Sequence, residues 1–300
     1  MRPPTQFRKR AAGLAVLLAA LAAPAENATG PVTLKENGIE ITIESGPNPW
    51  TNLEFNNNPD NFQFAIVTDR TGGARPGVFE DGVRKTNLLQ PEFVMSVGDL
   101  IQGGTEDRAQ IEKEWAEFNG FLAEFEMPFF YVAGNHDISN PVMAEVWKEK
   151  FGRPYYHFKY KDVLFLCMCS EDGARANVSD EQAAYFKKVL EENGDVRWTL
   201  AFIHQPLWRH ESGIWNKIEP LLAGRKHTVF AGHVHDYAKT VRGDGTRYYT
   251  LGTMGGSSEL RGDAFGEFDH ATWVTMSDDG PRITLLKLEG IRDENVRIVE

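Results

Sequence analysis

The chain has 300 residues, of which 41% are hydrophobic and 25% are charged, a balance that allows a full hydrophobic core and excludes intrinsic disorder. Its formal net charge of −11 argues against binding to nucleic acids or to anionic membrane surfaces. It contains only two cysteines, Cys167 and Cys169, and their position in one apolar run predicts core packing rather than a disulfide bond.

The first 25 residues have the pattern of a secretory signal peptide. A basic segment precedes an apolar run over residues 11–23, and Ala23-Pro24-Ala25 then has the form of a cleavage site. The apolar run is too short for a transmembrane helix, which needs roughly 20 apolar residues. We therefore expect cleavage near Ala25 and a secreted or periplasmic mature chain without a membrane span. Loss of four basic and no acidic residues would bring its net charge to −15.

The mature part alternates strand-like and helix-like patterns, which is typical of an α/β fold. Apolar or alternating runs predict strands over residues 39–43, 62–68, 93–97, 129–133, 155–160, 163–169, 198–203, 228–231, 248–251, 272–276 and 283–288. Amphipathic patterns predict helices over residues 78–89, 106–125, 141–151 and 180–192, the last after a capping box formed by Ser179 and Gln182. Neither a repeat nor a linker interrupts residues 26–300, so we expect one domain.

Five of these strands are followed directly by polar side chains. The residues concerned are Asp69, Asp99, Asn135 with His136, His204, and His233 with His235. Open α/β sheets bind ligands at the carboxyl ends of their strands. Asp, Asn and His are also residue types that bind borderline divalent metal ions through oxygen and imidazole nitrogen. The pattern therefore predicts a metal site at this edge of the fold.

The order and spacing of these residues resemble the calcineurin-like metallophosphoesterases, a family that includes purple acid phosphatases and phosphodiesterases. The resemblance spans residues 62–235 and rests on Gly98-Asp99, Gly134-Asn135-His136-Asp137, His204 and Gly232-His233-Val234-His235. It implies a four-layer α-β-β-α sandwich of two mixed β-sheets flanked by helices, formed by residues 26–300. It also implies two divalent or trivalent metal ions, such as manganese, iron or zinc, at one end of the sheets.

The resemblance assigns a role to each matching position. It implies that the first metal ion is held by Asp69, Asp99 and His235, and the second by Asp99, Asn135, His204 and His233, with Asp99 bridging. It implies that His136 protonates the leaving group and that Asp137 orients His136. Two such ions clamp the attacking and leaving oxygens of an in-line displacement. The implied activity is that of an exported phosphoric-ester hydrolase, acting on monoesters or diesters through a metal-bound hydroxide.

One position departs from the family pattern. The first motif usually reads Asp-x-His, whereas this chain has Asp69-Arg70-Thr71. Purple acid phosphatases also lack this histidine, but they place a tyrosine ligand three residues after the second aspartate. That position is Gln102 here, so Gln102 is a candidate further ligand. The departure leaves an alternative function open, in which the chain binds metal or a phosphorylated ligand without turnover.

Residues outside the motifs are candidates for contacts with a small phosphate-ester substrate. Arg70, between two motif positions, and Arg209 could bind the phosphate bidentately. Trp208, close to His204 in sequence, is a candidate for the wall of the pocket. The sequence leaves the metal identity, the ester preference and the oligomeric state open.

Overall fold

A computed structural model describes residues 31–291 except 37, 45 and 46. The predicted signal peptide and its cleavage site lie outside these residues, and the domain boundary at residue 26 stays a prediction. The chain divides into two compact units, Met1–Asn57 and Asn58–Glu300. The first unit contains an antiparallel hairpin of β1 (Val32–Glu36) and β2 (Ile39–Ile43), in which Leu34 pairs with Ile41.

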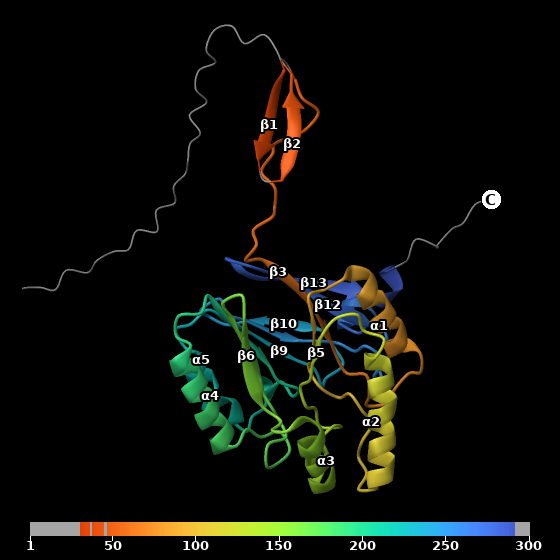
Figure 1. Cartoon of the computed structure of the whole chain (residues 1–300). Helices are drawn as coiled ribbons and strands as arrows, with labels where there is room; N and C mark the ends of the chain where they lie inside the picture. The colour runs from red at the N-terminus through yellow and green to blue at the C-terminus, as the bar shows by residue number, and fades with distance from the viewer. Residues whose placement is uncertain (1–30, 37, 45–46, 292–300) are drawn as a thin grey trace, which may run out of the picture. The chain divides into compact units, whose positions relative to one another are not determined.

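The second unit contains two mixed β-sheets (Figure 1). One sheet consists of β3 (Phe62–Val67), β4 (Val94–Ser96), β5 (Phe129–Phe130), β12 (His270–Ser277) and β13 (Gly280–Lys287), in the order β13-β12-β3-β4-β5. The other consists of β6 (Tyr156–Tyr160), β7 (Val163–Cys167), β8 (Trp198–Phe202), β9 (His227–Ala231), β10 (Ala238–Val241) and β11 (Arg247–Thr250), in the order β10-β11-β9-β8-β7-β6. Within each sheet the central strands run parallel, so their carboxyl ends lie at the same end of the sheet.

Alternate side chains along β3 point into two different apolar regions. Phe64 and Ile66 lie between the two sheets, and the ring centroid of Phe64 is 5.6 Å from that of Phe165 on the opposing sheet. Ala65 and Val67 point the other way, into the core that the helices cover. Because both faces of β3 are buried from Phe64 onward, residues 64–67 form a continuous apolar run instead of an alternating one.

Helices cover the outer faces of both sheets (Figure 1). The helices are α1 (Val78–Leu89), α2 (Arg108–Leu122) and α3 (Pro141–Phe151) on one side, and α4 (Asp180–Glu192) and α5 (Glu219–Leu222) on the other. Short 3₁₀ helices follow at Leu207–Arg209, Ile214–Lys217, Asp263–Phe265 and Leu288–Gly290. The predicted four-layer α-β-β-α sandwich of two mixed sheets is confirmed.

Capping side chains account for the starts of two helices, whereas two strands differ from the prediction. The hydroxyl of Ser179 accepts the Gln182 N–H at 3.0 Å, so α4 begins at the predicted capping box. Helix α2 begins later than predicted because Asp107 caps it, accepting the N–H of Ala109 at 2.9 Å. The buried strand predicted over residues 129–133 is wrong in extent: β5 has two half-buried residues at a sheet edge, paired with β4. Strand β10, which is exposed throughout, has no apolar pattern and was not predicted.

Two further features concern the cysteines and the length of the helices. Cys167 and Cys169 are buried and free, and burial raises the pKa of the Cys167 thiol to about 12, so this thiol is unreactive at neutral pH. No helix within the described part of the chain is long and apolar enough to cross a membrane.

Candidate metal centre

The candidate site forms where parallel strands of both sheets end. On one sheet β3, β4 and β5 lead into Asp69, Asp99 and Asn135, and on the other β8 and β9 lead into three histidines. Their potential ligand atoms form two clusters, each within 4.8 Å: Asp69, Asp99 and His235 in the first cluster, and Asp99, His204 and His233 in the second cluster. The structure thus brings together residues that lie far apart in the sequence, and Asp99 belongs to both clusters.

In the second cluster, donor atoms converge on Nε2 of His204. This nitrogen lies 3.0 Å from Asn135 Oδ1, 3.2 Å from Asp99 Oδ1 and 3.2 Å from His233 Nδ1. The other ring nitrogen, Nδ1, lies 2.8 Å from the carbonyl oxygen of Val97. Because a carbonyl can only accept, Nδ1 carries a proton and Nε2 is the nitrogen that can bind a metal ion.

The first cluster has the same arrangement around His235. Its Nε2 lies 3.4 Å from Asp69 Oδ1, and its Nδ1 donates to the carbonyl of Ser257 at 2.6 Å. The Asp69 carboxylate also accepts the Thr68 hydroxyl at 2.5 Å and the backbone N–H of His233 at 2.9 Å. A backbone carbonyl therefore holds His235 in place, and a hydroxyl and a backbone N–H hold Asp69, all from outside the cluster.

The electrostatics of the second cluster fit a bound cation. Burial alone would lower the pKa of His204, but the charge and hydrogen bond of Asp99 raise it to about 10. Burial alone would raise the pKa of Asp99, but His204 lowers it to about 2. Burial, and then the charge on His204, lower the pKa of His233 to about 4. Without metal, protonated His204 therefore pairs with the ionised Asp99 carboxylate, and a bound cation could replace that proton and leave both imidazoles neutral.

The backbone is strained at three of the candidate ligands. Asp99, His233 and His235 have φ values of 57°, 74° and 57°. These values lie in the left-handed region, which residues other than glycine rarely adopt. Gly134 allows the close approach beside Asp99, because a Cβ at this position would lie 2.3 Å from both the Asp99 nitrogen and its Oδ1. Such strain is characteristic of functional sites, where it places side chains that an unstrained turn could not.

Comparison with known proteins identifies the family. Residues 74–237, more than half of the chain, match the profile of the calcineurin-like phosphoesterases. The chain belongs to this family. The resemblance predicted from the motifs is confirmed, and all candidate ligands except Asp69 lie inside the matched range. No curated protein sequence gives a significant match.

Solved structures from several organisms have a similar fold. GAP50, described as the anchor in the inner membrane complex of Plasmodium, has 13% identity and a TM-score of 0.58, over 77% of this chain and 86% of its own. Purple acid phosphatase PPD1 from yellow lupin seeds has 14% identity and a TM-score of 0.55. The match covers 77% of this chain and 52% of the lupin chain. A dimetal phosphatase from Danio rerio has 14% identity and a TM-score of 0.51. The match covers 76% of this chain and 99% of the Danio rerio chain. At these identities the similarity establishes the fold alone.

The variant first motif of this phosphoesterase supports the backbone of the site. The buried Thr71 hydroxyl lies 2.8 Å from the carbonyl of Ile101 and 3.1 Å from that of Asp99, so it fastens the loop after β4. The side chain of Gln102 lines a separate cavity together with Arg70 and Thr71. Its Oε1 lies 3.5 Å from the Gly73 nitrogen. The side chain of Gln102, the candidate further ligand of the first cluster, thus lines a different cavity from the one that Asp99 and His235 line.

His136 and Asp137 do not interact in the way we expected. The Nδ1 of His136 donates to the carbonyl of Gln102 at 2.6 Å, so Gln102 orients this ring through its backbone. The buried Asp137 carboxylate instead accepts backbone N–H groups of Asp99, Leu100, Ile101 and Gly134 at 2.7–3.1 Å. The expectation that Asp137 orients His136 is therefore corrected: Asp137 positions the loop that carries Asp99.

The three substrate-binding candidates are occupied elsewhere. Arg70 is buried, donating to Glu117 of α2 at 2.8 Å and to the Leu100 carbonyl at 3.0 Å. Trp208 packs in the core, with its ring centroid 5.1 Å from that of Tyr248. Arg209 is exposed and lies 3.9 Å from Asp236. None of the three lines the two cavities beside the candidate metal ligands, so the structure does not support them as substrate contacts.

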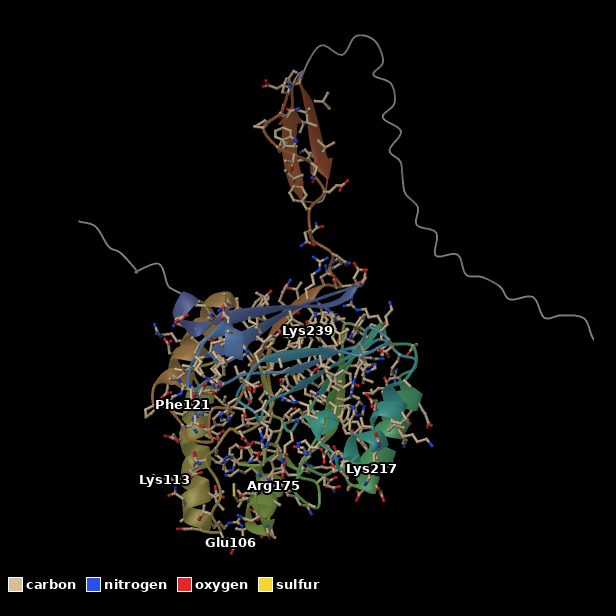
Figure 2. All side chains as sticks on the ribbon, turned by 180° about the vertical axis from the view of Figure 1, so that it is seen from behind. Glu106, Lys113, Phe121, Arg175, Lys217 and Lys239 are labelled. Atoms are coloured by element: carbon tan, nitrogen blue, oxygen red, sulfur yellow. The ribbon has the colours of Figure 1, made fainter. Side chains whose placement is uncertain are left out.

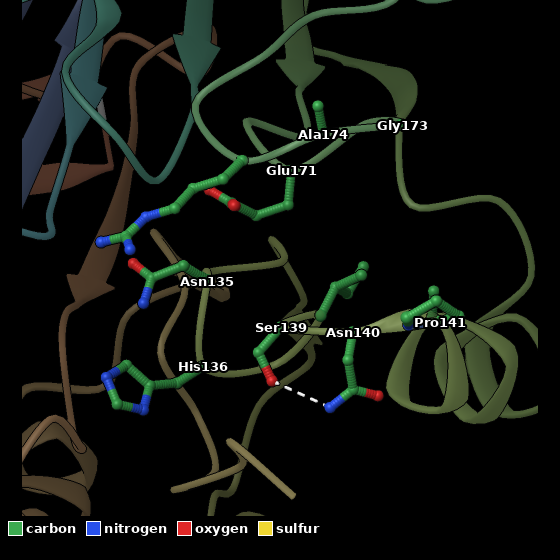
Figure 3. Close-up of a pocket in the computed structure, with 11 residues that line it drawn as sticks. Asn135, His136, Ser139, Asn140, Pro141, Glu171, Gly173 and Ala174 are labelled. Carbon is green, nitrogen blue, oxygen red and sulfur yellow. Dashed lines mark hydrogen bonds between the residues drawn. The ribbon is translucent and has the colours of Figure 1, made fainter. Parts of the chain in front are cut away.

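Two cavities meet at the metal centre. The centre cavity, of about 440 Å³, is lined by Asp99, Asn135, His136, His233 and His235 among others. The side cavity, of about 580 Å³, extends from Asn135 and His136 along the start of α3 (Figure 3). Arg175 lines both cavities, and Figure 2 shows it near α3. Sequence reasoning missed Arg175 because it lies in the loop between β7 and α4, outside every motif.

Proposed function

We propose that this family member is an exported, metal-dependent phosphoesterase that hydrolyses small phosphate esters. The observation that carries the proposal is the meeting of both ligand clusters with His136 in the centre cavity. A Cβ at Gly72 would lie 3.0 Å from Cε1 of His235 and 3.6 Å from Nε2 of His136, so the two imidazoles face one small space. A phosphate group in this space would contact the metal centre and His136 together.

Each residue at the site has a side chain suited to one role, either holding a metal ion or transferring a proton. Asp69, Asp99 and His235 would hold one divalent ion, and Asp99, Asn135, His204 and His233 the other. Two ions at such a centre activate water and neutralise charge on a phosphate group. The Gln102 carbonyl keeps the proton of His136 on Nδ1, so Nε2 faces the cavity. The imidazolium form of His136 can then give the Nε2 proton to the leaving oxygen.

Thr71 supports the alternative function, a member that binds metal or a phosphorylated ligand without turnover. Its hydroxyl is engaged by two backbone carbonyls, which leaves three protein ligands in the first cluster. A weakly held first ion would lower turnover while the second cluster, with Asn135 as a fourth donor beside its three residues, still bound its ion. His136 argues against this alternative, because a binding module has little need for a positioned proton donor.

Turnover of nitrophenyl phosphate esters tests the proposal. We expect the protein loaded with manganese or zinc to hydrolyse a nitrophenyl monoester or diester, and a chelator to abolish the reaction because both ligand clusters would be emptied. Metal content is measured on the same samples. Protein that holds two ions per chain and binds inorganic phosphate, yet hydrolyses neither ester, would contradict the proposal and support the binding function.

Export is tested separately by mass. We expect the exported chain to begin at Glu26, because the basic, apolar and small-residue segments occur in the order that signal peptidase recognises. Mass spectrometry of the intact protein from the extracytoplasmic fraction measures this directly. A soluble extracytoplasmic protein that retains residues 1–25 would refute cleavage, without bearing on the hydrolytic activity.

A further inference from the structure

Among the described residues, the guanidinium of Arg175 has no ionic partner. Four other arginines near the site loops have a carboxylate partner: Arg70 with Glu117, Arg75 with Asp269, Arg209 with Asp236, and Arg261 with Glu267. Arg175 is exposed, and within the described ranges no residue forms an ion pair or a hydrogen bond with its guanidinium. Arg175 nevertheless lines the centre cavity together with Asp99 and His233 of the second cluster. An unpaired guanidinium beside a metal centre is available for an anionic ligand.

The loop that carries Arg175 is held firmly at its base. The N–H of Asn177 donates to the Ser170 carbonyl at 2.7 Å, and the Asn177 side chain donates to the Asp172 carbonyl at 2.6 Å. Gln182 of α4 then donates to the Asp172 carboxylate at 3.0 Å. Arg175 thus projects from a loop whose backbone is already ordered, so little backbone entropy is lost when it binds a ligand.

The position of Arg175 relative to His136 determines which part of a substrate it would meet. Both residues, together with Asn135, line the boundary between the centre cavity and the side cavity. A proton donor must contact the leaving oxygen, so the leaving group extends from His136 away from the metal centre. The side cavity lies there, and its volume of about 580 Å³ is within the range of small-molecule sites. Figure 3 shows Asn135, His136 and Glu171 around this space.

Charge and oxygen count then distinguish the ester classes. A phosphate monoester has three non-bridging oxygens and a charge of about −1.5 to −2 at neutral pH. A diester has two non-bridging oxygens and a single charge. Arg175 adds a permanent cation and a planar set of N–H donors at the boundary, next to Asn135 and His136. This addition favours the ester with the extra anionic oxygen.

We propose that Arg175 binds the third non-bridging oxygen of a phosphate monoester, with the leaving alcohol in the side cavity. This inference rests on the proposed function and narrows it to phosphomonoesters. Arg175 acts here as a specificity-determining residue: it contacts the phosphate group, and neither donates the catalytic proton nor holds the metal.

The test compares a monoester and a diester with the same nitrophenolate leaving group. In manganese-loaded protein, Arg175→Gln should lower kcat/KM for the monoester about 10- to 100-fold, because a charge-assisted contact is lost. The loss for the diester should stay within about threefold. Affinity for inorganic phosphate, measured by calorimetry, should fall in parallel with the monoester value. Arg282→Gln, at an exposed position on β13 that lines neither cavity, is the matched control and should change none of these values.

A second variant tests the side cavity. Ala144 lies on α3 and lines only the side cavity of the two, so Ala144→Leu should raise KM for the nitrophenyl monoester and leave phosphate affinity unchanged. Equal losses for both esters in Arg175→Gln, or unchanged phosphate affinity, would overturn the inference while the phosphoesterase function stood. If wild-type protein hydrolysed neither ester, the proposed function would fail, and the phosphate affinity of Arg175→Gln would still decide whether Arg175 binds phosphate.

Discussion

Replacing His136 with asparagine should lower the rate of hydrolysis about 10²- to 10⁴-fold for substrates with poor alkoxide leaving groups. His136 is held by the Gln102 carbonyl with Nε2 towards the centre cavity, so it is placed to protonate the leaving oxygen. Its side chain belongs to neither ligand cluster, so metal binding should persist in the variant. Nitrophenolate needs less protonation as it leaves, so the loss should be smaller for nitrophenyl esters.

The measurement pairs two leaving groups with one metal assay. Rates for an alkyl and a nitrophenyl phosphate are compared in wild type and His136→Asn, with metal content determined for both proteins. His210→Asn is the control, because His210 lines neither cavity beside the described ligands. Equal losses for the two leaving groups would show that His136 binds the phosphate or stabilises charge instead of donating a proton. Loss of metal in the variant would show that His136 supports the ligand clusters.

The candidate ligands could be picked out from the sequence because each follows a recognisable apolar run, and the structure brings them together. Asp69 follows β3 and His204 follows β8 closely, and the parallel order of the strands brings the ends together. The two-sheet architecture was predicted from the family resemblance, and the burial of both faces of β3 and β7 agrees with it because each strand then needs a layer on either side. For these residues, the local sequence pattern and the order of the strands are sufficient to predict that they lie together.

The roles of the neighbouring residues were not accessible, because they depend on contacts between distant segments. Arg70 has the sequence position of a substrate contact, but it forms an ion pair with Glu117 on α2. The sequence does not show that α2 packs next to the loop after β3. Asp137 is adjacent to His136 in sequence, yet its carboxylate turns to the amides that follow β4. Arg175 lies in an irregular loop whose placement is set by hydrogen bonds to Ser170 and Asp172.

The role of Asp137 leads to the other large effect that we expect. Its buried carboxylate accepts four backbone N–H groups, so Asp137→Ala would leave these donors without a partner in the interior. We expect Asp137→Ala to lower the free energy of unfolding of the metal-free protein by about 3–4 kcal/mol. Asp137→Asn keeps one oxygen acceptor but turns an NH₂ group towards two of the donors, so its loss should be about 1–2 kcal/mol.

Urea unfolding of the metal-free variants gives these values, and Glu149→Gln is the matched control. Glu149 is an exposed acid paired with Arg108 between α3 and α2, so its loss should change stability by less than about 0.5 kcal/mol. Turnover should fall with stability in the Asp137 variants, because the loop that Asp137 holds carries Asp99, the residue common to both ligand clusters. Excess metal should restore part of this turnover, since binding to Asp99 favours the native loop. Wild-type stability in Asp137→Ala would mean that water or a shifted backbone satisfies the four amides, and that the loop after β4 holds its shape without the carboxylate.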